Sequence, residues 1–491
     1  MADRRVLFRC DAGATMGGGH VMRCLTLADA LALVGWHCDF AVSPETLDIV
    51  AGDRFGDHGL KILADPFDAE MTPEGYDLAI VDHYGLSAAY ETGLRHAADM
   101  IAVIDDFPTR PHDCDVILDQ NHGRGARDYR GVIPAGAKAF CGTDYALLRP
   151  DFPAARAEAL ARRKSGRAQR VLVSLGLTDL NGVTGDVMER LLALEAGVSF
   201  DVVIGPAAPS RARLAQMAQR DDVSLHIATG DMAALMARAD ICIGAGGTTS
   251  WERCCLGLPT VLLVLADNQK DIAASLDEAG AAHALSSWND GEIETALAGL
   301  LADDDTRQAM ADAAAALCDG GGATRVAEEL TTLVDAPAAE PGALVVRDAD
   351  EGDCADLWLW RNHPKARAVS LSSDEIPWDG HREWFAASLL RADRKILIAE
   401  QSGVSVGYVR FDDVDGAWLV SIALAPRVYG WGMAAEALAA GVAAMQARGH
   451  ARFSAEIHRD NVAAQRIFAT CGFARCAPSG GAFEAYELNE G

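Results

Sequence analysis

Positive charge is scarce in this chain. Its 491 residues include 43 Lys and Arg against 71 Asp and Glu, which gives a formal net charge of −28. A surface of that sign repels polyphosphate backbones, so we expect no nucleic-acid partner. An anionic small molecule would have to be held by local groups against this overall field.

Long apolar runs are missing as well. The first residues lack the apolar stretch of a signal peptide, and no run reaches the roughly 20 apolar residues that a membrane-spanning helix needs. The twelve cysteines are scattered without a Cys-x-x-Cys pair, which indicates reduced, mainly structural thiols. We therefore expect a cytoplasmic protein without a membrane partner. Because no metal-ligand spacing is visible, we also expect it to be metal-independent.

Apolar residues make up half of the chain, and its length is ample for about three domains. Strand-like and helix-like patterns alternate over residues 1–155 and again over 165–335, as in Rossmann-like α/β layers. Two prolines and a glycine in 336–342 predict a short linker. Residues 343–491 then form a third, smaller domain.

A glycine-rich turn near the start of the chain joins a predicted strand to a predicted helix. His20 stands at this turn, where a neutral imidazole can act as a general base, although a lone histidine there is as often a capping or core residue. The spacing matches neither the dinucleotide fingerprint nor the phosphate loop ending in Lys, so NAD and ATP are excluded. Without Cβ atoms the glycines let backbone N–H groups approach an anion closely, and they are Gly17, Gly18 and Gly19.

Polar residues follow two buried strands of the same domain. Ligands of open α/β sheets collect at the carboxyl ends of the strands, so we expect these side chains to share a cleft with His20. The alternative of equal weight is that the acidic residues cap the next helix. The residues concerned are Asp82, His83 and Tyr84 after one strand, and Asp105 and Asp106 after the next.

The second domain has its own strand–turn–helix of small residues within 240–259. The backbone N–H groups and hydroxyls of such a turn suit a diphosphate without a cation. Glu252, one turn into the helix, is placed to accept ribose hydroxyl protons. An ordinary tight turn is the alternative. The residues at the turn are Gly246, Gly247, Thr248 and Thr249.

The run 9–28 resembles the opening signature of the nucleotide-sugar hydrolases of pseudaminic acid biosynthesis, which remove UDP from a 2,4-diacetamido-2,4,6-trideoxy sugar, and of related spore-coat polysaccharide proteins. The likeness covers roughly the first 330 residues and implies two Rossmann-like lobes of GT-B type, the second holding UDP. Leu177 and Leu180 depart from the family's Gly and Pro in the loop after 170–174. The resemblance makes His20 the catalytic base and implies further substrate contacts at Arg9, Asp11, Asp82, Tyr84, Asn268 and Gln269.

The third domain contains another glycine turn, between a strand over 417–424 and an Ala/Leu-rich helix. Its N–H groups suit the pyrophosphate of coenzyme A. The Arg-x-x-Gly-x-Gly run and the segment 461–473 resemble the two signatures of GNAT acetyltransferases, which implies acetyl-CoA as the acetyl donor, entering between two splayed strands. The cofactor contacts then implied are Ile422, Leu424, Arg427, Gly430, Gly432, Met433 and Asn461.

The proton-transfer groups of this domain are less defined. Phe468 stands where many GNAT enzymes have the tyrosine that reprotonates the thiolate, which leaves Tyr486, His458, Cys471 or water as general acid. Glu456 is a candidate base, and equally a surface glutamate of a strand. The aromatic-rich segment 358–385 resembles the acceptor side of GNATs that act on amino groups of nucleotide sugars or protein N-termini.

Together these features predict a bifunctional enzyme of pseudaminic acid biosynthesis. It would N-acetylate a UDP-4-amino-4,6-dideoxy sugar with acetyl-CoA, and His20 would then activate the water that displaces UDP. One alternative is the same chemistry in a related amino-sugar or polysaccharide route. Another is a nucleotide-sugar-binding module tethered to a protein or amine acetyltransferase, and a glycosyltransferase is a weaker third. The sugar's stereochemistry, the exact nucleotide and the oligomeric state stay open.

Overall fold

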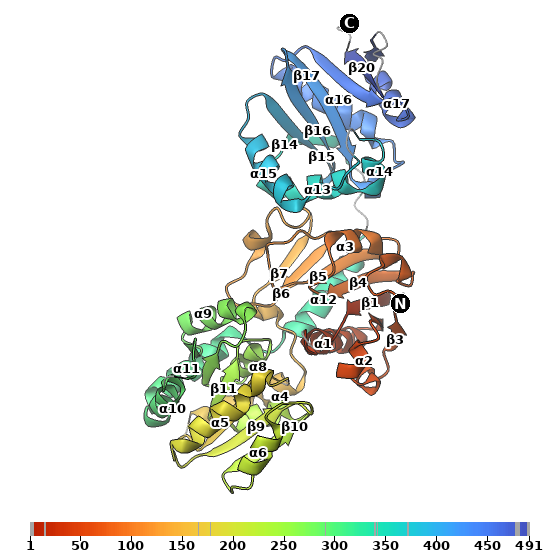
Figure 1. The fold of residues 1–491 in the computed structure, drawn as a ribbon. Helices are drawn as coiled ribbons and strands as arrows, with labels where there is room; N and C mark the ends of the chain where they lie inside the picture. Colours follow the sequence, from red (N-terminus) through yellow and green to blue (C-terminus); the bar gives the residue numbers. More distant parts are fainter. Residues whose placement is uncertain are drawn as a thin grey trace.

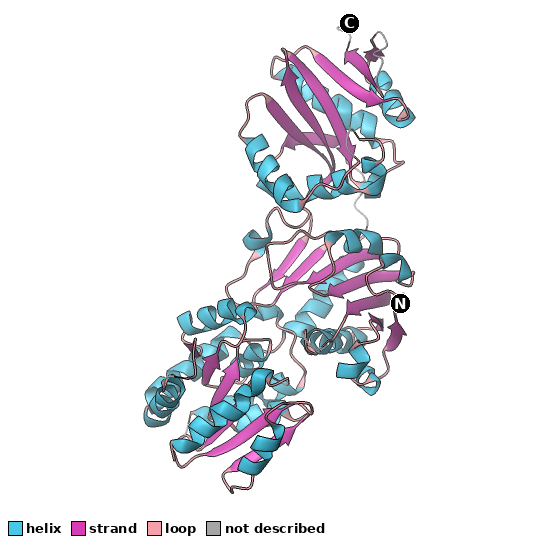
Figure 2. Ribbon diagram, in the orientation of Figure 1, coloured by secondary structure: helices cyan, strands magenta, loops and turns pink. Residues whose placement is uncertain are grey.

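The computed structural model describes residues 4–13, 16–164, 166–176, 178–289, 291–337, 340, 342–370, 373–476 and 482–488. These residues form three sheets in succession along the chain (Figures 1 and 2). The first lobe lies in the middle of the molecule, with the second lobe on one side and the third domain on the other (Figure 1). No helix among the described residues is long and apolar enough to cross a membrane.

The first lobe is a parallel sheet in the order β3-β2-β1-β4-β5-β6-β7. Both faces are covered, so the middle of each central strand is apolar, as in Val6, Leu7 and Phe8 of β1, which are fully buried. Its strands are β1 (Arg4–Cys10), β2 (Trp36–Val42), β3 (Gly59–Ile62), β4 (Tyr76–Asp82), β5 (Ala98–Ile104), β6 (Val116–Asp119) and β7 (Lys138–Cys141). Its helices are α1 (Gly19–Leu33), α2 (Thr46–Ile49) and α3 (Ala88–Leu94).

This strand order creates a switch point between β1 and β4. The connection from β1 leads through α1 to β2 on one side of β1, and the sheet continues on its other side with β4. Ligands of open α/β sheets bind in the crevice that such a reversal leaves at the carboxyl ends. His20, at the start of α1, and Asp82, at the end of β4, both lie at this point.

The second lobe repeats the pattern with the order β10-β9-β8-β11-β12-β13. Its switch point lies between β8 and β11. The turn after β11 therefore lies at the switch point of this lobe, just as the glycine turn before α1 lies at the switch point of the first lobe. Its strands are β8 (Arg170–Ser174), β9 (Ser199–Ile204), β10 (Val223–Ile227), β11 (Ile241–Ala245), β12 (Thr260–Leu263) and β13 (His283–Leu285). Its helices are α5 (Val183–Ala193), α6 (Arg211–Met217), α7 (Met232–Arg238), α8 (Thr249–Cys255), α9 (Lys270–Glu278), α10 (Glu292–Ala302) and α11 (Asp304–Leu317).

Two helices tie the lobes together. Helix α4 (Asp151–Arg163) leads into the second lobe, where Arg156 donates to the carbonyl oxygens of Ala315 at 2.7 Å and Cys318 at 2.9 Å. Helix α12 (Gly322–Val334) returns to the first lobe and places Val326 and Leu330 in its apolar core beside α1. The sequence had assigned residues up to 335 to the second lobe, whereas this final helix packs on the first.

The third domain is a mixed sheet in the order β14-β15-β16-β17-β18-β20-β19. Strands β17 and β18 pair in parallel only at Trp418–Phe453 and Leu419–Ser454, so their later residues diverge, which confirms the predicted splay. Its strands are β14 (Leu344–Asp348), β15 (Arg394–Gln401), β16 (Val404–Val414), β17 (Ala417–Leu424), β18 (Phe453–His458), β19 (Phe473–Arg475) and β20 (Phe483–Leu488). Its helices are α13 (Cys354–Asn362), α14 (Pro364–Arg367), α15 (Trp378–Leu389), α16 (Met433–Ala447) and α17 (Val462–Thr470).

This domain is docked on the first lobe, in addition to being linked to it. The buried carboxylate of Asp356 accepts a hydrogen bond from the backbone N–H of Ala135 at 3.0 Å, and Arg130 pairs with Asp350 at 2.9 Å. At Gly131, whose φ is +79°, a Cβ would lie 2.5 Å from the carbonyl oxygen of Glu351. Residues 338, 339 and 341 of the predicted linker lie outside the described residues.

Candidate functional site

A cleft of about 500 Å³ lies between the two parallel lobes. It brings the turn before α1 and the turn before α8 to the same space, so two segments that the sequence treated separately face one another. The first lobe contributes Met16, Gly19, His20, Arg23, Tyr84, Asp106, Phe107, Asn121, His122, Gly123 and Arg124, and the second contributes Gly246, Gly247, Thr248, Asp271, Ile272, Ala274, Ser275 and Glu278.

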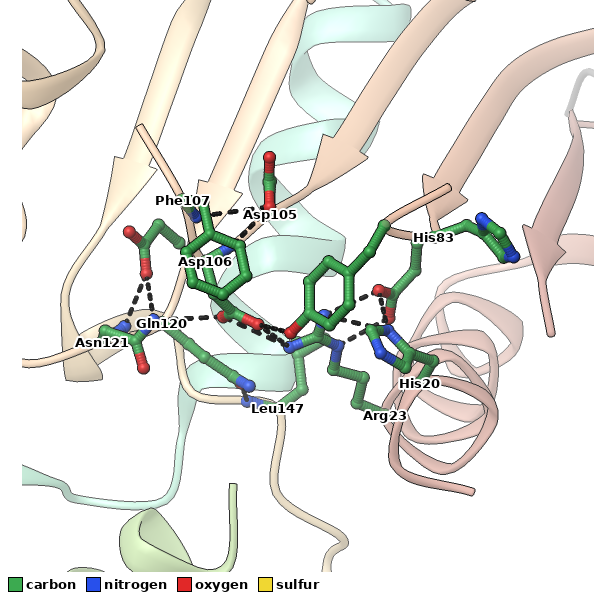
Figure 3. A network of polar contacts seen from close by, with 12 residues as sticks. His20, Arg23, His83, Asp105, Asp106, Phe107, Gln120, Asn121 and Leu147 are labelled. Carbon is green, nitrogen blue, oxygen red and sulfur yellow. Dashed lines mark hydrogen bonds and ion pairs between the residues drawn. The ribbon is translucent and has the colours of Figure 1, made fainter. Parts of the chain in front are cut away.

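His20 lines the cleft and forms a dyad with the buried Asp82; Figure 3 shows His20 beside Arg23. The imidazole is 6% exposed, and its Nδ1 lies 2.5 Å from Oδ1 of Asp82. A carboxylate at this distance assigns the ring proton to Nδ1 and leaves Nε2 with the lone pair. Burial alone would raise the pKa of Asp82, but the Arg23 guanidinium and the neighbouring His20 imidazole outweigh it and hold that pKa well below its usual value. The dyad is therefore an imidazole oriented by an ionised carboxylate.

Arg23 extends this network, and the sequence reasoning did not give it a role. Its Nε donates to Oδ2 of Asp82 at 2.5 Å, its Nη2 donates to Oδ1 at 2.6 Å, and its Nη1 lies 3.3 Å from Asp106. The signal was present, because Arg23 lies three residues after His20 and therefore on the same face of the helix.

Asp106 connects the dyad to the next strand ends. It accepts hydrogen bonds from the hydroxyl of Tyr84 at 2.5 Å and from the side-chain amide of Asn121 at 3.0 Å. Burial, reinforced by Asp106, raises the pKa of Tyr84, so the phenol keeps its proton. The Tyr84 ring meets the His20 ring edge-on, with centroids 4.6 Å apart. Asn121 was not predicted, although it lies two residues after the end of β6.

Asp119, at the end of β6, fixes Asn121 from behind. Its Oδ1 accepts from both the backbone N–H of Asn121 at 2.9 Å and the side-chain amide at 2.8 Å, while Tyr129 donates to Oδ2 at 2.9 Å. Burial raises the pKa of Asp119 to about 6. Because its amide N–H group is held by two acids, Asn121 is positioned to turn its amide oxygen toward a ligand.

Arg9 and Asp11 lie behind the cleft and are not among the residues that line it. The fully buried Arg9 donates to Asp11 and to the carbonyl of Pro66, each at 2.8 Å, and Asp11 accepts from the backbone N–H of Ser43 at 2.6 Å. Their charges are thus used to hold the loops beside β1. Arg9 and Asp11 were predicted as substrate contacts, whereas in the structure they hold loops that lie behind the cleft.

The first glycine turn is shaped by its own backbone. Gly17, at φ +73°, exchanges hydrogen bonds with Gly13 and closes a small loop. Gly18 is the residue before α1, and Gly19 opens the helix and lines the cleft. A positive φ at Gly17 requires glycine there, whereas Gly18 and Gly19 have no such conformation.

The turn in the second lobe depends on a close approach. A Cβ on Gly246 would lie 3.0 Å from Cβ of Gln269, in the short helix η6 (Asp267–Gln269). Gln269 accepts the backbone N–H of Leu265 at 2.9 Å, so its amide oxygen is already bonded. Asn268 belongs to the same short helix, but its side chain lies outside the described residues. Gln269 thus supports the turn that presents Gly247 and Thr248.

Other predicted contacts of this lobe lie behind the turn. The hydroxyl of Thr249 accepts from Arg253 at 3.2 Å, and Arg253 also donates to the carbonyl of Ala245 at 2.9 Å. Burial raises the pKa of the half-buried Glu252 to about 7, and Glu252 is not a lining residue. In the loop after β8, Asp179 accepts from the backbone of Thr184 at 2.8 Å, and Leu177 lies outside the described residues.

An ion pair crosses the cleft between described residues of the two lobes. Nη2 of Arg124, in the loop after β6, donates to Oδ2 of Asp271 in α9 at 3.2 Å. His122 lines the cleft from the same loop. No local sequence pattern predicted these two basic residues, because neither lies at the end of a strand or at the start of a helix. Among the described residues, no group of three His, Cys, Asp or Glu side chains is arranged to hold a metal ion.

The glycine turn of the third domain is open. Gly430 and Gly432 have φ values of +85° and +80°, and a Cβ at either would meet nothing within 4 Å. Gly432 precedes α16, and the Trp431 side chain between the glycines is 71% exposed. Arg427 donates to the carbonyl of Ser405 at 2.7 Å, which fixes the turn to β16.

The remaining predicted residues of this domain have different settings. Asn461 accepts the backbone N–H of Ala464 at 3.0 Å and so caps α17. Met433 is buried in the core, whereas Ile422 and Leu424 are half-buried on β17 where it leaves β18. Glu456 is exposed on β18. Phe468 is buried against the edge of Phe473 and provides no proton donor.

Residues 343–474 match the family model of the acetyltransferase (GNAT) domain. An uncharacterized protein of Methanocaldococcus jannaschii is 22% identical over 418 residues, covering 82% of this chain and 83% of that protein. The UDP-2,4-diacetamido-2,4,6-trideoxy-beta-L-altropyranose hydrolase of Campylobacter jejuni is 24% identical over 279 residues, covering 56% of this chain and 97% of the enzyme. The spore coat polysaccharide biosynthesis protein SpsG of Bacillus subtilis is 23% identical, covering 55% of this chain and 80% of that protein.

Solved structures resemble the two parts separately. MurG of Acinetobacter baumannii covers 67% of this chain and 99% of its own, with 15% identity and a TM-score of 0.48. The aminoglycoside acetyltransferase AAC(6')-Ib in complex with coenzyme A covers 30% of this chain and 93% of its own, with 18% identity and a TM-score of 0.27. The chain thus joins a pair of parallel α/β lobes, distantly related to a UDP-sugar hydrolase and a spore-coat polysaccharide protein, to a C-terminal GNAT acetyltransferase domain.

Proposed function

We propose that the two lobes hydrolyse a UDP-2,4-diacetamido-2,4,6-trideoxy sugar, and that the GNAT domain uses acetyl-CoA to make that substrate from its UDP-4-amino precursor. The observation that carries the proposal is the single cleft in which the His20–Asp82 dyad faces the turn of Gly246, Gly247 and Thr248. A general base and an anion-binding turn on opposite walls suit a reaction between a water and a nucleotide sugar. The relationship to the Campylobacter hydrolase agrees with this chemistry.

In the hydrolysis, the diphosphate lies against the second lobe and the sugar against the first. Nε2 of His20 takes a proton from a water, whose oxygen bonds to the anomeric carbon as the bond from that carbon to the UDP oxygen breaks. The bonding electrons leave with UDP. Backbone N–H groups of the turn stabilise the charge that develops there, with the side chains of His122 and Arg124 nearby in the same cleft.

In the acetyl transfer, the free amine of the precursor attacks the thioester carbonyl of acetyl-CoA, so that an amide forms and the coenzyme leaves as a thiol. The open turn at Gly430 and Gly432 and the gap between β17 and β18 are where the coenzyme would bind. Glu456 is exposed beside this gap and is the proposed acceptor of the ammonium proton. Acetylation comes first, because the hydrolase substrate already carries both acetamido groups. A docked domain keeps the second site close to the product of the first.

The test is product analysis by mass spectrometry. Purified full-length protein is incubated with UDP-4-amino-4,6-dideoxy-N-acetyl sugars of both configurations, with and without acetyl-CoA. We expect amide formation and then UDP release without any acceptor sugar. UDP release that requires an acceptor would instead indicate a glycosyltransferase, and no release would indicate a binding module.

The variant His20→Ala separates the two activities. We expect UDP release to fall by about 10²–10⁴-fold, the usual contribution of a positioned base, while acetyl transfer in the same preparation stays intact and serves as the folding control. Near wild-type UDP release in this variant would remove His20 from the role of base.

A further inference from the structure

We propose that Arg23 is a positioning residue that keeps His20 in its neutral, proton-accepting form by cancelling negative charge around the imidazole. The inference rests on the proposed function only in taking His20 as the base of the hydrolysis. It concerns how a base can work at neutral pH when it is bonded to a buried acid.

The difficulty lies in the carboxylates beside the ring. Asp82 orients the imidazole, but an adjacent negative charge also stabilises the protonated ring, which has no lone pair to offer a water. Asp106 adds a second carboxylate at the same end of the sheet. The chain contains an example of this outcome. His112 lies between Glu91 and Asp105. Burial alone would lower the pKa of His112, but these two acids raise that pKa to about 9.

Arg23 is placed to prevent that outcome at His20. It donates to both oxygens of Asp82, at 2.5 and 2.6 Å, so Oδ1 of Asp82 is shared between the imidazole and the guanidinium. Its Nη2 lies 3.3 Å from Nδ1 of His20, and its Nη1 lies 3.3 Å from Asp106. The guanidinium therefore contacts both acids and lies beside the ring (Figure 3). Burial would lower the pKa of Arg23, but Asp82 and Asp106 raise it well above its usual value, so the charge is permanent.

The other groups facing the ring leave this balance unchanged. Tyr84 stays neutral because its pKa is raised, and burial together with the charge of Arg9 lowers the pKa of His83 to about 4, so that it is neutral as well. The Cys24 thiol on α1 is also neutral, since burial raises its pKa. The other charged or titratable residues that line the cleft are His122 and Arg124 of the first lobe and Asp271 and Glu278 of the second, of which Arg124 and Asp271 are paired.

The experiment measures the protonation of His20 in two independent ways. The first is the pH dependence of kcat/KM for UDP release. The second is NMR titration of the ¹⁵N-histidine resonances of the full-length protein, with His20 assigned by its absence in His20→Ala. The variants are Arg23→Met, Arg23→Lys, Asp106→Asn, and the double variant that joins Arg23→Met to Asp106→Asn.

We expect Arg23→Met to move both the acid limb of the rate profile and the NMR midpoint of His20 upward by about one to two pH units. Arg23→Lys keeps the charge and leaves the midpoint near that of the wild type, even if turnover falls. Asp106→Asn moves the midpoint downward, because Arg23 then faces a single acid. The double variant brings it back toward the wild type. A purely structural role for Arg23 would lower activity without moving these midpoints.

An unchanged or lowered midpoint in Arg23→Met overturns the proposal, and so does an unchanged midpoint in Asp106→Asn. If Arg23→Met does not fold, Arg23→Lys and Asp106→Asn still decide, since Asp106 is partly exposed and its substitution leaves the dyad intact. If the midpoints shift as expected while wild-type protein releases no UDP, the charge balance stands and the proposed hydrolysis fails. If UDP is released but the midpoints stay fixed, the reverse holds.

Discussion

The cleft between the lobes and the Gly430–Gly432 turn of the GNAT domain both present glycines at the start of a helix, yet they are built differently. In the first lobe the side chains that carry chemistry are buried and bonded to one another, from His20 through Asp82 and Arg23 to Asp106. The turn of the GNAT domain has open space around Gly430 and Gly432, and Glu456 on β18 is exposed. The cleft of the first lobe therefore depends on charged side chains that hydrogen bonds hold in place before a ligand binds. The turn of the GNAT domain depends instead on the conformation of its backbone.

The largest expected effect tests how far the first lobe depends on buried charge. His112 is fully buried between two acids, and the pKa of about 9 exceeds the ordinary value of 6.5. Because the folded pKa is raised, the stabilisation is complete below pH 6.5 and is lost as pH rises through 9. We expect the free energy of local unfolding to fall by about 3 kcal/mol across this window.

Hydrogen exchange of the β5 amides, followed by mass spectrometry, measures this change in the first lobe alone. His112→Gln removes the titrating group, so the pH dependence between 6.5 and 9 should disappear. Amides of β16 in the GNAT domain serve as the reference. Equal pH dependence in the two strands would contradict the assignment to His112.

The second test asks whether the site of the GNAT domain depends on the backbone conformation of its glycine turn. Gly432→Ala introduces a side chain at φ +80°, which costs about 1–2 kcal/mol and should weaken acetyl-CoA binding by about 5–30-fold. Gly449→Ala is the matched control, because Gly449 has φ +89°, equally open surroundings, and a position just after the far end of α16. Calorimetric titration with acetyl-CoA should separate them. Similar losses in both variants would show that the strain acts through overall stability.

The same contrast explains what could be predicted from sequence. Strand ends, glycine turns and helix starts are local patterns, so the three-part fold, the positions of His20 and Asp82, and the splay of β17 from β18 followed from them. The partners of a charge are not local. Arg9 belongs to the family-like motif, but its guanidinium pairs with Asp11 inside the lobe. Arg23 contacts Asp82 and Asp106 only because the fold brings α1 against the ends of β4 and β5. Helix α12 was assigned to the wrong side for the same reason, since its amphipathic pattern does not say which lobe it covers.

The smallest expected effect concerns the ion pair that crosses the cleft. If Arg124 serves the departing diphosphate, Arg124→Met should lower kcat/KM for UDP release by about 10-fold, the equivalent of one charged hydrogen bond. Asp271→Asn removes the same ion pair but keeps the cation, which also lies 3.7 Å from Asp119, and takes away a negative charge near an anionic substrate. It should therefore lower KM, by about 2-fold.

The two variants distinguish a structural role of this ion pair from a catalytic role, because both remove the pair and only Arg124→Met removes the cation. A contact that merely holds the lobes together would make their kinetic losses alike, and small-angle X-ray scattering would then show the same opening in both. A cation that works on the diphosphate would make their effects opposite in sign, and both effects would shrink as ionic strength rises. Kinetic effects of opposite sign would show that charged side chains of the first lobe also act on the nucleotide. Equal kinetic losses would indicate that these side chains act only on the sugar, and that backbone groups bind the diphosphate, as proposed for the coenzyme in the GNAT domain.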